Sequence, residues 1–326
     1  MRPSLLLLAY AAMLATVGAG LLRRARWPER APRLGILGWH VLTASIVASL
    51  VLAGLALTVP TLPVASGVAD FLRACVMMVQ AQYATPGGAA IASTGLVLAL
   101  AVAGRVGYCI ARAWRAAALD RRHQLEVLAL VGRTEDGVGA TIVDHEIAEV
   151  YCLPGRRGRI VLTTGALAAL DARQLAAVLA HERAHLRARH DLAIAVASAL
   201  ADAFPRVPAF ARAHEQVRRL IELAADDTAA RNGDRLTLAE GILTVAAGRT
   251  PAASLGAGGS TVAVRVRRLL APPRRLGALR AAMIATGLGA LLAVPLWLAA
   301  APAVAAETAY CPLPPAGQSV PPPSAS

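Results

Sequence analysis

Four apolar runs, each long enough to cross a lipid bilayer, constrain this chain more than any other feature. They cover residues 4–22, 34–59, 89–111 and 281–306. Because about 20 apolar residues in an α-helix span the hydrocarbon core of a bilayer, the runs predict four transmembrane helices. Only 16% of the residues are charged and 56% are hydrophobic, whereas soluble domains carry roughly 25% charged residues. This composition argues against both a disordered chain and an ordinary soluble enzyme.

The first run, residues 4–22, has two interpretations, a cleaved signal peptide or a retained span. A signal peptide carries its positive charge ahead of the apolar run. Here Arg2 alone precedes the run, and five arginines follow it within residues 23–33. We therefore expect a retained transmembrane helix with its N-terminus outside the cytoplasm.

The excess of arginine predicts the orientation of the chain. The formal net charge is +13, and the chain contains no lysine. Residues 23–33 carry five arginines and one glutamate, and residues 112–280 carry 25 arginines and 17 acidic residues. With four spans, both segments face the same side, which the positive-inside rule identifies as the cytoplasm. The arginines near the end of the second segment, among them Arg265, Arg267 and Arg268, are interpreted as charges that flank the membrane.

The predicted organisation has four parts. Residues 1–111 form an N-terminal membrane region with three spans, residues 112–280 a cytoplasmic domain, residues 281–306 the fourth span, and residues 307–326 a disordered, proline-rich extracytoplasmic tail. We expect a multi-pass protein of the plasma membrane with both termini extracytoplasmic, and the lipid bilayer as a partner of the basic residues. Direct nucleic-acid binding is not expected, because aromatic residues, which stack on bases, make up only 4% of the chain.

A metal-binding motif lies within the predicted cytoplasmic domain. Residues 171–186 are rich in alanine and leucine and contain no glycine or proline, which predicts a helix with Asp171 as its N-cap. His181 and His185 are four residues apart, so both imidazoles project from one face and can bind one Zn²⁺. Glu182 can then reach water beside the metal as a general base, the arrangement of an HExxH motif. The alternative is a set of exposed polar residues on an amphipathic helix.

An open catalytic zinc site needs a third protein ligand. The metzincin extension of the motif is excluded, because Ala188 and Asp191 stand where it requires glycine and histidine. Downstream, Glu222 and Asp226 share one face of a second predicted helix. Glu222 can complete the ligand set, and Asp226 can accept a hydrogen bond from a ligating histidine and fix its tautomer. Asp227 competes for that second role, and a solvated acidic face is the alternative for the pair.

The segment before the first predicted helix favours β-structure. Residues 150–165 contain two short runs of strand-forming residues around a turn with Pro154 and Gly155. They predict a hairpin, and hence a domain of the α+β class. An exposed edge of this hairpin would bind an extended peptide by β-addition. The alternative is a hairpin that serves only as a scaffold.

One segment resembles the zinc-site core of integral-membrane gluzincin peptidases. It covers residues 148–192 and reads AEVYCLPGRRGRIVLTTGALAALDARQLAAVLAHERAHLRARHDL. The FPRVPAF stretch at 204–210, the RVRRLLAPP stretch at 265–273 and the order of the spans are more similar to the BlaR/MecR-type antirepressor peptidases, which are related to membrane proteases of the heat-shock and CAAX-processing type. The resemblance implies a multi-span α-helical membrane protein that carries a mainly helical metalloprotease domain with a small β-hairpin or sheet.

By this resemblance, His181, His185 and Glu222 correspond to the metal ligands, Glu182 to the catalytic base and Asp226 to the aspartate that supports a ligand. The implied cofactor is one catalytic Zn²⁺, and the implied activity is cleavage of a cytoplasmic protein in transmembrane signalling. A winged-helix transcriptional repressor is the candidate substrate. The alternatives are a quality-control protease of the heat-shock or CAAX-processing type and a non-catalytic transducer that retains the fold.

The resemblance does not extend to the penicillin-binding sensor domain of the β-lactam-sensing members. Only residues 307–326 follow the last predicted span, and they contain neither an SxxK nor a KTG motif. We therefore expect a peptidase in a membrane frame without β-lactam sensing. The oligomeric state and the pairing of Cys75 with Cys311 are left open by the sequence.

Overall fold

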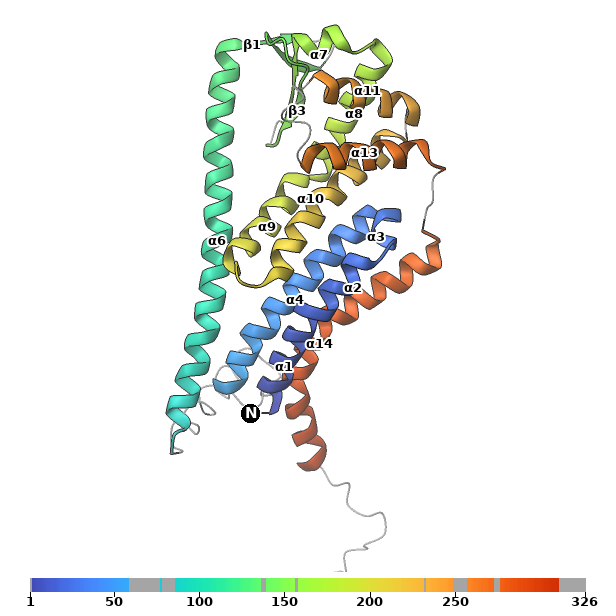
Figure 1. Ribbon diagram of the computed structural model, residues 1–326. Helices are drawn as coiled ribbons and strands as arrows, with labels where there is room; N and C mark the ends of the chain where they lie inside the picture. The colour runs from blue at the N-terminus through green and yellow to red at the C-terminus, as the bar shows by residue number, and fades with distance from the viewer. Residues whose placement is uncertain are drawn as a thin grey trace, which may run out of the picture. The chain divides into compact units, whose positions relative to one another are not determined.

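The computed structural model describes residues 2–58, 77, 86–135, 139–155, 158–231, 233–248, 257–272 and 276–310. Most of these residues are helical, and four short strands among them form one mixed sheet (Figure 1). This architecture confirms the expected α+β class. The chain forms two compact units, the first comprising Met1–Ala11, Val47–Val102 and Ala293–Ser326, the second Ala12–Ile46 and Ala103–Leu292. Cys75, Cys311 and residues 311–326 of the predicted tail lie outside the described residues, whereas residues 307–310, also expected to be disordered, belong to the last helix.

Four helices in the described part of the chain are long and apolar enough to cross a bilayer. The first combines α1 (Arg2–Met13), the π-helical segment η1 (Leu14–Gly18) and α2 (Ala19–Arg24). The others are α4 (Pro32–Thr58), α6 (Gly88–Val131) and α14 (Ala278–Tyr310). Each of the four apolar runs therefore lies in one of these helices, as predicted. The short helix α3 (Trp27–Arg30) lies between the first two.

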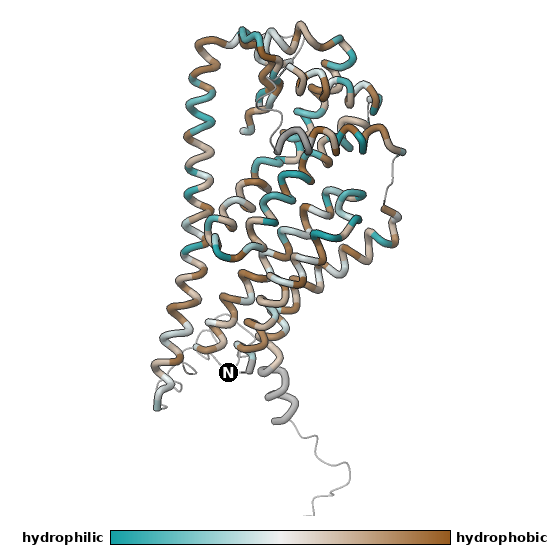
Figure 2. The backbone as a smooth tube through the Cα atoms, in the orientation of Figure 1, coloured by the Kyte–Doolittle hydropathy of each residue, from teal (hydrophilic) through white to brown (hydrophobic). Residues whose placement is uncertain are grey.

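Helix α6 is much longer than the predicted third span. It contains 44 residues. At 1.5 Å per residue this is about 66 Å, roughly twice the thickness of the hydrocarbon core. Its N-terminal half is apolar, and hydrophilic residues recur along its C-terminal half (Figure 2). The predicted boundary at residue 111 thus falls inside one continuous helix, which carries the chain from the apolar run to the sheet.

The sheet contains β1 (Gly132–Glu135), β2 (Ala140–Val143), β3 (Val150–Leu153) and β4 (Arg159–Thr163), in the order β1-β2-β4-β3. Strands β3 and β4 pair antiparallel, which confirms the predicted hairpin. Strand β2 pairs parallel with β4 and antiparallel with β1. Strands β1 and β2, of four residues each, are not predicted from the sequence. Because β3 is last in the order, one of its edges pairs with no other described strand.

Six further helices are described in the second unit. They are α7 (Thr164–Ala169), α8 (Ala172–Ala188), α9 (His190–Ala203), α10 (Pro208–Ala229), α11 (Arg235–Gly248) and α13 (Ala257–Leu270). Helix α8 contacts β3, α10 and α11. Val178 and Leu179 of α8 are buried with Leu162 of β4 in one apolar cluster. On α10, Val217 and Ile221 are fully buried, four residues apart on one face. Helix α8 thus packs against both the sheet and the neighbouring helices, and these contacts hold the residues of the site described below in position.

Arg105 interrupts the third apolar run, and its partners lie at the end of α9. Its guanidinium donates hydrogen bonds to the backbone carbonyls of Asp202 and Ala203. Arg112 on the same helix forms an ion pair of 2.6 Å with the Asp202 carboxylate. The last carbonyls of a helix have no intrahelical donor. Both arginines therefore fasten α6 to the C-terminal end of α9.

Candidate metal centre and active site

Helix α8 presents the histidines of the predicted motif. Its N-cap is Asp171, whose carboxylate accepts hydrogen bonds of 2.8 Å from the backbone N–H groups of Arg173 and Gln174. The Gln174 side chain accepts a hydrogen bond from the Asp171 N–H in return, which completes a capping box. The predicted helix start at Asp171 is therefore confirmed. Within this helix the spacing of four residues places His181 and His185 on one face.

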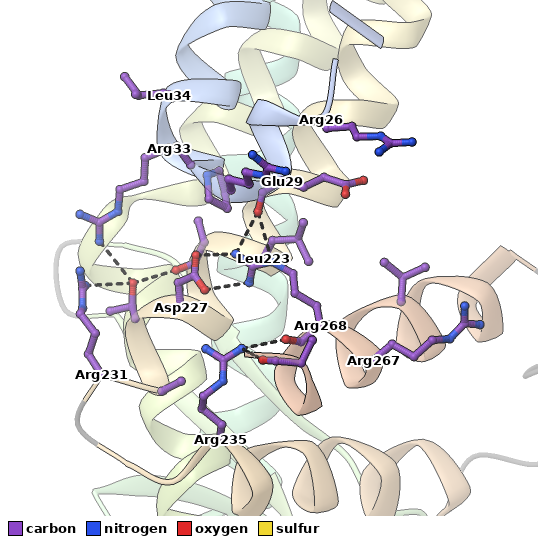
Figure 3. A pocket seen from close by; sticks show the side chains of 18 of the residues that line it. Arg26, Glu29, Arg33, Leu34, Leu223, Asp227, Arg231, Arg235, Arg267 and Arg268 are labelled. Atoms are coloured by element: carbon purple, nitrogen blue, oxygen red, sulfur yellow. Dashed lines mark hydrogen bonds and ion pairs between the residues drawn. The ribbon is translucent and has the colours of Figure 1, made fainter. Parts of the chain in front are cut away.

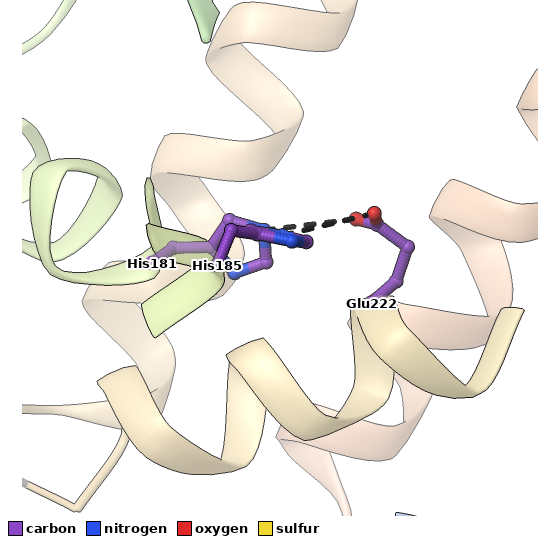
Figure 4. Close-up of side chains that lie close together, drawn as sticks. All are labelled: His181, His185 and Glu222. Carbon is purple, nitrogen blue, oxygen red and sulfur yellow. Dashed lines mark hydrogen bonds and ion pairs between the residues drawn. The ribbon is translucent and has the colours of Figure 1, made fainter. Parts of the chain in front are cut away.

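Three side chains meet at one point between α8 and α10 (Figure 4). The Nε2 atoms of His181 and His185 lie 3.1 Å apart. The Glu222 carboxylate oxygens lie 3.6 Å from the first of these atoms and 3.8 Å from the second. Tetrahedral zinc with bonds of 2.0–2.1 Å separates its ligand atoms by about 3.3 Å. The two nitrogens and one carboxylate thus have the chemistry and nearly the spacing of a three-ligand metal site.

The sequence leaves open whether Asp226 or Asp227 lies beside a ligating histidine. In the structure the two side chains have different partners. Asp226 is only 1% exposed, and its Oδ1 lies 3.0 Å from Nδ1 of His181. That Nδ1 is buried and has no hydrogen bond of good geometry, so the contact is one of proximity and charge. Asp227 instead forms a two-point ion pair with Arg268. Asp226 is therefore the aspartate that lies beside a candidate ligand.

Arg265 of α13 belongs to the site, and its interpretation as a membrane-flanking charge is wrong. Its side chain is only 12% exposed. Its Nε and Nη2 donate to the Asp226 carboxylate at 2.9 and 2.7 Å, and its Nη1 lies 2.9 Å from Glu222. Its Nη2 also lies 3.2 Å from Nε2 of His181. The buried Asp226 and the half-buried Glu222 carry two neighbouring negative charges, which require a cation nearby. No sequence pattern identifies which of the many arginines supplies it.

The electrostatics of the metal-free site follow from these contacts. Burial opposes charge on Glu222, but hydrogen bonding to His181 and the Arg265 guanidinium lower its pKa to about 2. The same neighbours hold the pKa of Asp226 well below its usual range against burial. Burial disfavours charge on His181, yet Asp226 and Glu222 raise its pKa to about 9. Burial, together with the charge of His181, lowers the pKa of His185 to about 4. These neighbours therefore favour a positive charge on His181, between the two carboxylates, and a neutral His185.

Glu182 lines the same cavity, which has a volume of about 690 Å³. Burial raises the pKa of its carboxyl above the ordinary value, and the charge of Glu222 acts in the same direction. Cys152 of the edge strand β3 lies beside it, and burial and then the Glu182 carboxylate raise the pKa of this thiol to about 12. The thiol is thus neutral near pH 7 and not a nucleophile. The cavity brings together a proton acceptor, the three candidate ligands and an unpaired strand edge.

His190, at the start of α9, is a site residue that the sequence pattern does not identify. The chain enters α9 through Arg189, a non-glycine residue with φ of 47°. This turn places the buried His190 ring edge-to-face against His185, with the two Nδ1 atoms 3.1 Å apart. The outer nitrogen of His185 therefore has a partner that can hold its ring orientation. His214, on α10, does not line the cavity.

Comparison with known proteins identifies one family model that matches part of the chain. Residues 114–255 match the model of peptidase family M48. The match runs from the C-terminal half of α6 past α11, and it includes the three candidate ligands and Glu182. No curated protein and no solved structure gives a match. Together with the long apolar helices, the match supports a metallopeptidase of a membrane-associated type.

Proposed function

We propose that this M48-type membrane metallopeptidase is a zinc-dependent endopeptidase with His181, His185 and Glu222 as metal ligands and Glu182 as catalytic base. One observation carries the proposal. The ligand atoms of the three residues lie within 4.8 Å of one another, in a cavity that Glu182 also lines. Two imidazoles and one carboxylate from two helices are a usual ligand set of hydrolytic zinc sites. Bound zinc supplies Lewis acidity there, which polarises a carbonyl group and acidifies water.

Glu182 moves the proton in this proposal. Its carboxylate accepts a proton from the attacking water and donates it to the nitrogen of the leaving amine. The raised pKa of Glu182 suits both steps, because proton transfer is most efficient when the pKa of the base approaches the working pH. Cys152 keeps a neutral thiol beside it and does not compete as a nucleophile.

Asp226, Arg265 and His190 position the ligands. Asp226 lies against His181 and His190 against His185, each at the ring nitrogen that faces away from Glu222. Arg265 bridges Asp226 and Glu222 and neutralises their combined charge. Groups that hold metal ligands in this way commonly change metal affinity 10- to 100-fold when removed. The proposed site thus has an outer layer of one aspartate, one arginine and one histidine.

The edge of β3 is the proposed binding surface for the substrate backbone. Val150, Tyr151 and Cys152 of β3 line the cavity together with residues of α8, α10, α11 and α13. An extended peptide that pairs with this edge would cross the cavity with its carbonyl groups near Glu182. A strand edge binds main-chain groups in the middle of a chain as well as at its ends, which supports an endopeptidase.

The proposed substrate is a cytoplasmic protein, and a winged-helix transcriptional repressor is the first candidate. The support is the resemblance of the flanking segments to BlaR/MecR-type antirepressor peptidases and the basic character of residues 112–280, which the positive-inside rule assigns to the cytoplasm. The quality-control protease remains the alternative within the same chemistry. Transcript profiling of a deletion strain separates them. A small regulon without membrane stress is expected, and a broad membrane-stress response would contradict the repressor proposal.

The test of the activity uses the purified full-length chain in detergent. We expect the wild-type protein to contain one zinc ion and to cleave casein. Glu182→Gln should keep the zinc and lose cleavage by at least about 100-fold, the usual contribution of a general base. Glu222→Gln should lose zinc as well. Glu215→Gln, an exposed change two turns earlier on α10, is the matched control and should keep both. Zinc binding with cleavage that does not depend on Glu182 would contradict the proposal.

A further inference from the structure

A second cavity, of about 770 Å³, lies in the second unit and shares no lining residue with the first. It is formed by the segment 26–34 around α3, by the C-terminal part of α10 and by the end of α13 (Figure 3). Seven arginines line it, against two carboxylates, Glu29 and Asp227. Pockets of this size accommodate small-molecule ligands. The pocket is therefore strongly basic.

Both carboxylates are already engaged. Asp227 accepts two hydrogen bonds from Arg268, at 2.7 and 2.8 Å. Glu29 accepts a hydrogen bond from Arg219, which is outside the lining. Arg235 donates only to backbone carbonyls at the end of α13. The remaining arginines of the pocket have no carboxylate within ion-pair distance among the described residues.

Arg33 and Arg231 show where an anion would bind. They come from α4 and from the end of α10, and each donates to the Thr228 hydroxyl at 3.3 Å. Figure 3 shows the two side chains approaching each other from opposite sides. Two guanidinium groups so close repel each other unless an anion lies between them. Guanidinium groups bind phosphate oxygens in pairs. The Thr228 hydroxyl donates its own hydrogen to the Ala224 carbonyl at 2.8 Å, so the two guanidinium groups are the donors for an anion.

We propose that this pocket binds the phosphate group of an anionic phospholipid. The lipid, rather than a soluble phosphate compound, is favoured by the position of the pocket in the chain. Segment 26–34 connects the apolar helices Pro3–Arg24 and Pro32–Thr58, so in a bilayer it lies at the surface, where lipid headgroups are found. Arginines at such a surface attract the negative charge of anionic lipid headgroups. Several such arginines line this one pocket.

The occupant would bridge α10 and α13, the helices that carry Asp226 and Arg265. Asp227 and Thr228 of α10 follow directly on Asp226, and Arg267 of α13 is two residues from Arg265. A headgroup held by both helices therefore stabilises their packing. This consequence concerns the stability of the second unit and does not require the protein to be an active peptidase.

The test measures lipid binding by the full-length chain in an uncharged detergent. Native mass spectrometry and thermal melting are recorded with short-chain phosphatidylglycerol, short-chain phosphatidylcholine or inorganic phosphate. We expect saturable binding of phosphatidylglycerol, at least about tenfold tighter than of the other two probes, accompanied by a higher melting temperature. Arg33→Gln/Arg231→Gln should weaken phosphatidylglycerol binding about tenfold or more. Arg187→Gln/Arg218→Gln removes two exposed arginines outside the pocket and should leave binding unchanged.

Three other outcomes of this experiment would contradict the proposal. Equal binding of phosphatidylglycerol by Arg33→Gln/Arg231→Gln would show that the pocket is not the site. Equal binding of phosphatidylcholine would exclude recognition of the anionic headgroup, and inorganic phosphate binding as tightly as the lipid would indicate a soluble ligand instead. Should the glutamine variant fail to fold, Arg33→Lys/Arg231→Lys keeps the charge and loses the paired donors. It should bind more weakly than the wild type, and wild-type binding would contradict the proposal.

Discussion

Arg265 shows how much one buried side chain contributes to this site. It is the cation for two carboxylates on α10, and its own helix lies beyond the residues that match the family model. Burial would favour a neutral Arg265, but the hydrogen bonds to Asp226 and the charge of Glu222 raise its pKa further. Its charge is therefore permanent, and the ion pairs depend on the carboxylates alone.

We expect Arg265→Gln to destabilise the metal-free protein by about 3–5 kcal/mol, because it removes the guanidinium from the buried Asp226 and the half-buried Glu222 and leaves His181 as their remaining cationic neighbour. The measurement is thermal or denaturant unfolding in detergent with a chelator present. Arg267→Gln, an exposed change on the same helix, is the control and should stay within about 0.5 kcal/mol of the wild type. Equal losses in the two variants would show that Arg265 does not stabilise the site.

The ion pair of Arg265 with Glu222 predicts that the stability of the protein depends on pH. The pKa of Glu222 is lowered to about 2, from an unfolded value of about 4.3. A lowered carboxyl pKa stabilises the folded state above the unfolded value, and this contribution is lost as the pH falls through the folded value. The stability difference between wild type and Arg265→Gln, both metal-free, should therefore be full above about pH 5 and shrink toward pH 2. A difference that does not change over this range would contradict the assignment.

His190 is expected to orient His185 through the contact between their Nδ1 atoms. His190→Ala should lower zinc affinity about 10- to 100-fold, measured by competition with a chromophoric chelator. His190→Gln keeps a polar group near His185 and should recover part of the affinity. His214→Ala lies outside the cavity and should have wild-type affinity. If His190→Ala binds zinc as the wild type does, His190 has no positioning role.

At the scale of elements, α10 connects the two cavities. Glu222 and Asp226 face α8 on one side, and Asp227 and Thr228 line the basic pocket on the other. The buried apolar face of α10, which includes Leu220 and Ile221, holds the helix in one rotation. A rotation by one residue, about 100°, would move the acidic pair away from the histidines. The packing of α10 thus decides the ligand set as much as the residue types do.

The packing of α4 against α6 in the first unit depends on small residues. A Cβ atom at Gly95 would lie 2.5 Å from the carbonyl oxygen of Gly54, so the backbones are in direct contact. Thr58 of α4 also donates a hydrogen bond of 3.0 Å to the carbonyl of Ala92 on α6. Small residues allow such close approach of helices in membranes.

Gly95→Ala should therefore destabilise the protein by about 1–3 kcal/mol, because the helices must move apart. Gly104→Ala is the matched control on the same helix. A Cβ at Gly104 meets no atom within 4 Å, and the change should be neutral or stabilising by up to about 1 kcal/mol. Thermal melting in detergent compares the two. Equal melting temperatures would show that the contact of α4 with α6 tolerates a methyl group.

For the whole molecule, the distribution of arginine predicts the orientation in the membrane. Residues 23–33 and 112–280 hold nearly the entire net positive charge, and the positive-inside rule therefore predicts that both face the cytoplasm. Reporter fusions after Arg122 and after Ala306 test this prediction. The first should report the cytoplasm and the second the exterior. The reverse result would place the candidate metal centre outside and remove the repressor proposal.

The sequence by itself determined the helices of the four apolar runs, the α8 cap at Asp171 and the hairpin of β3 and β4. These features depend on local patterns, namely apolar length, capping residues and strand-forming runs around a turn. The candidate ligands His181, His185 and Glu222 were also accessible to sequence analysis, because spacing of four residues places side chains on one helical face.

Only the tertiary structure decided which charged residue meets which. It placed Arg265 at Asp226, separated Asp226 from Asp227, brought His190 to His185 and gathered Arg33 and Arg231 around Thr228. The arginines are chemically identical along the chain, and their partners lie on other helices. Ion pairs form wherever packing brings opposite charges together. Helix packing, which local patterns do not encode, therefore selects the few arginines that build the two cavities.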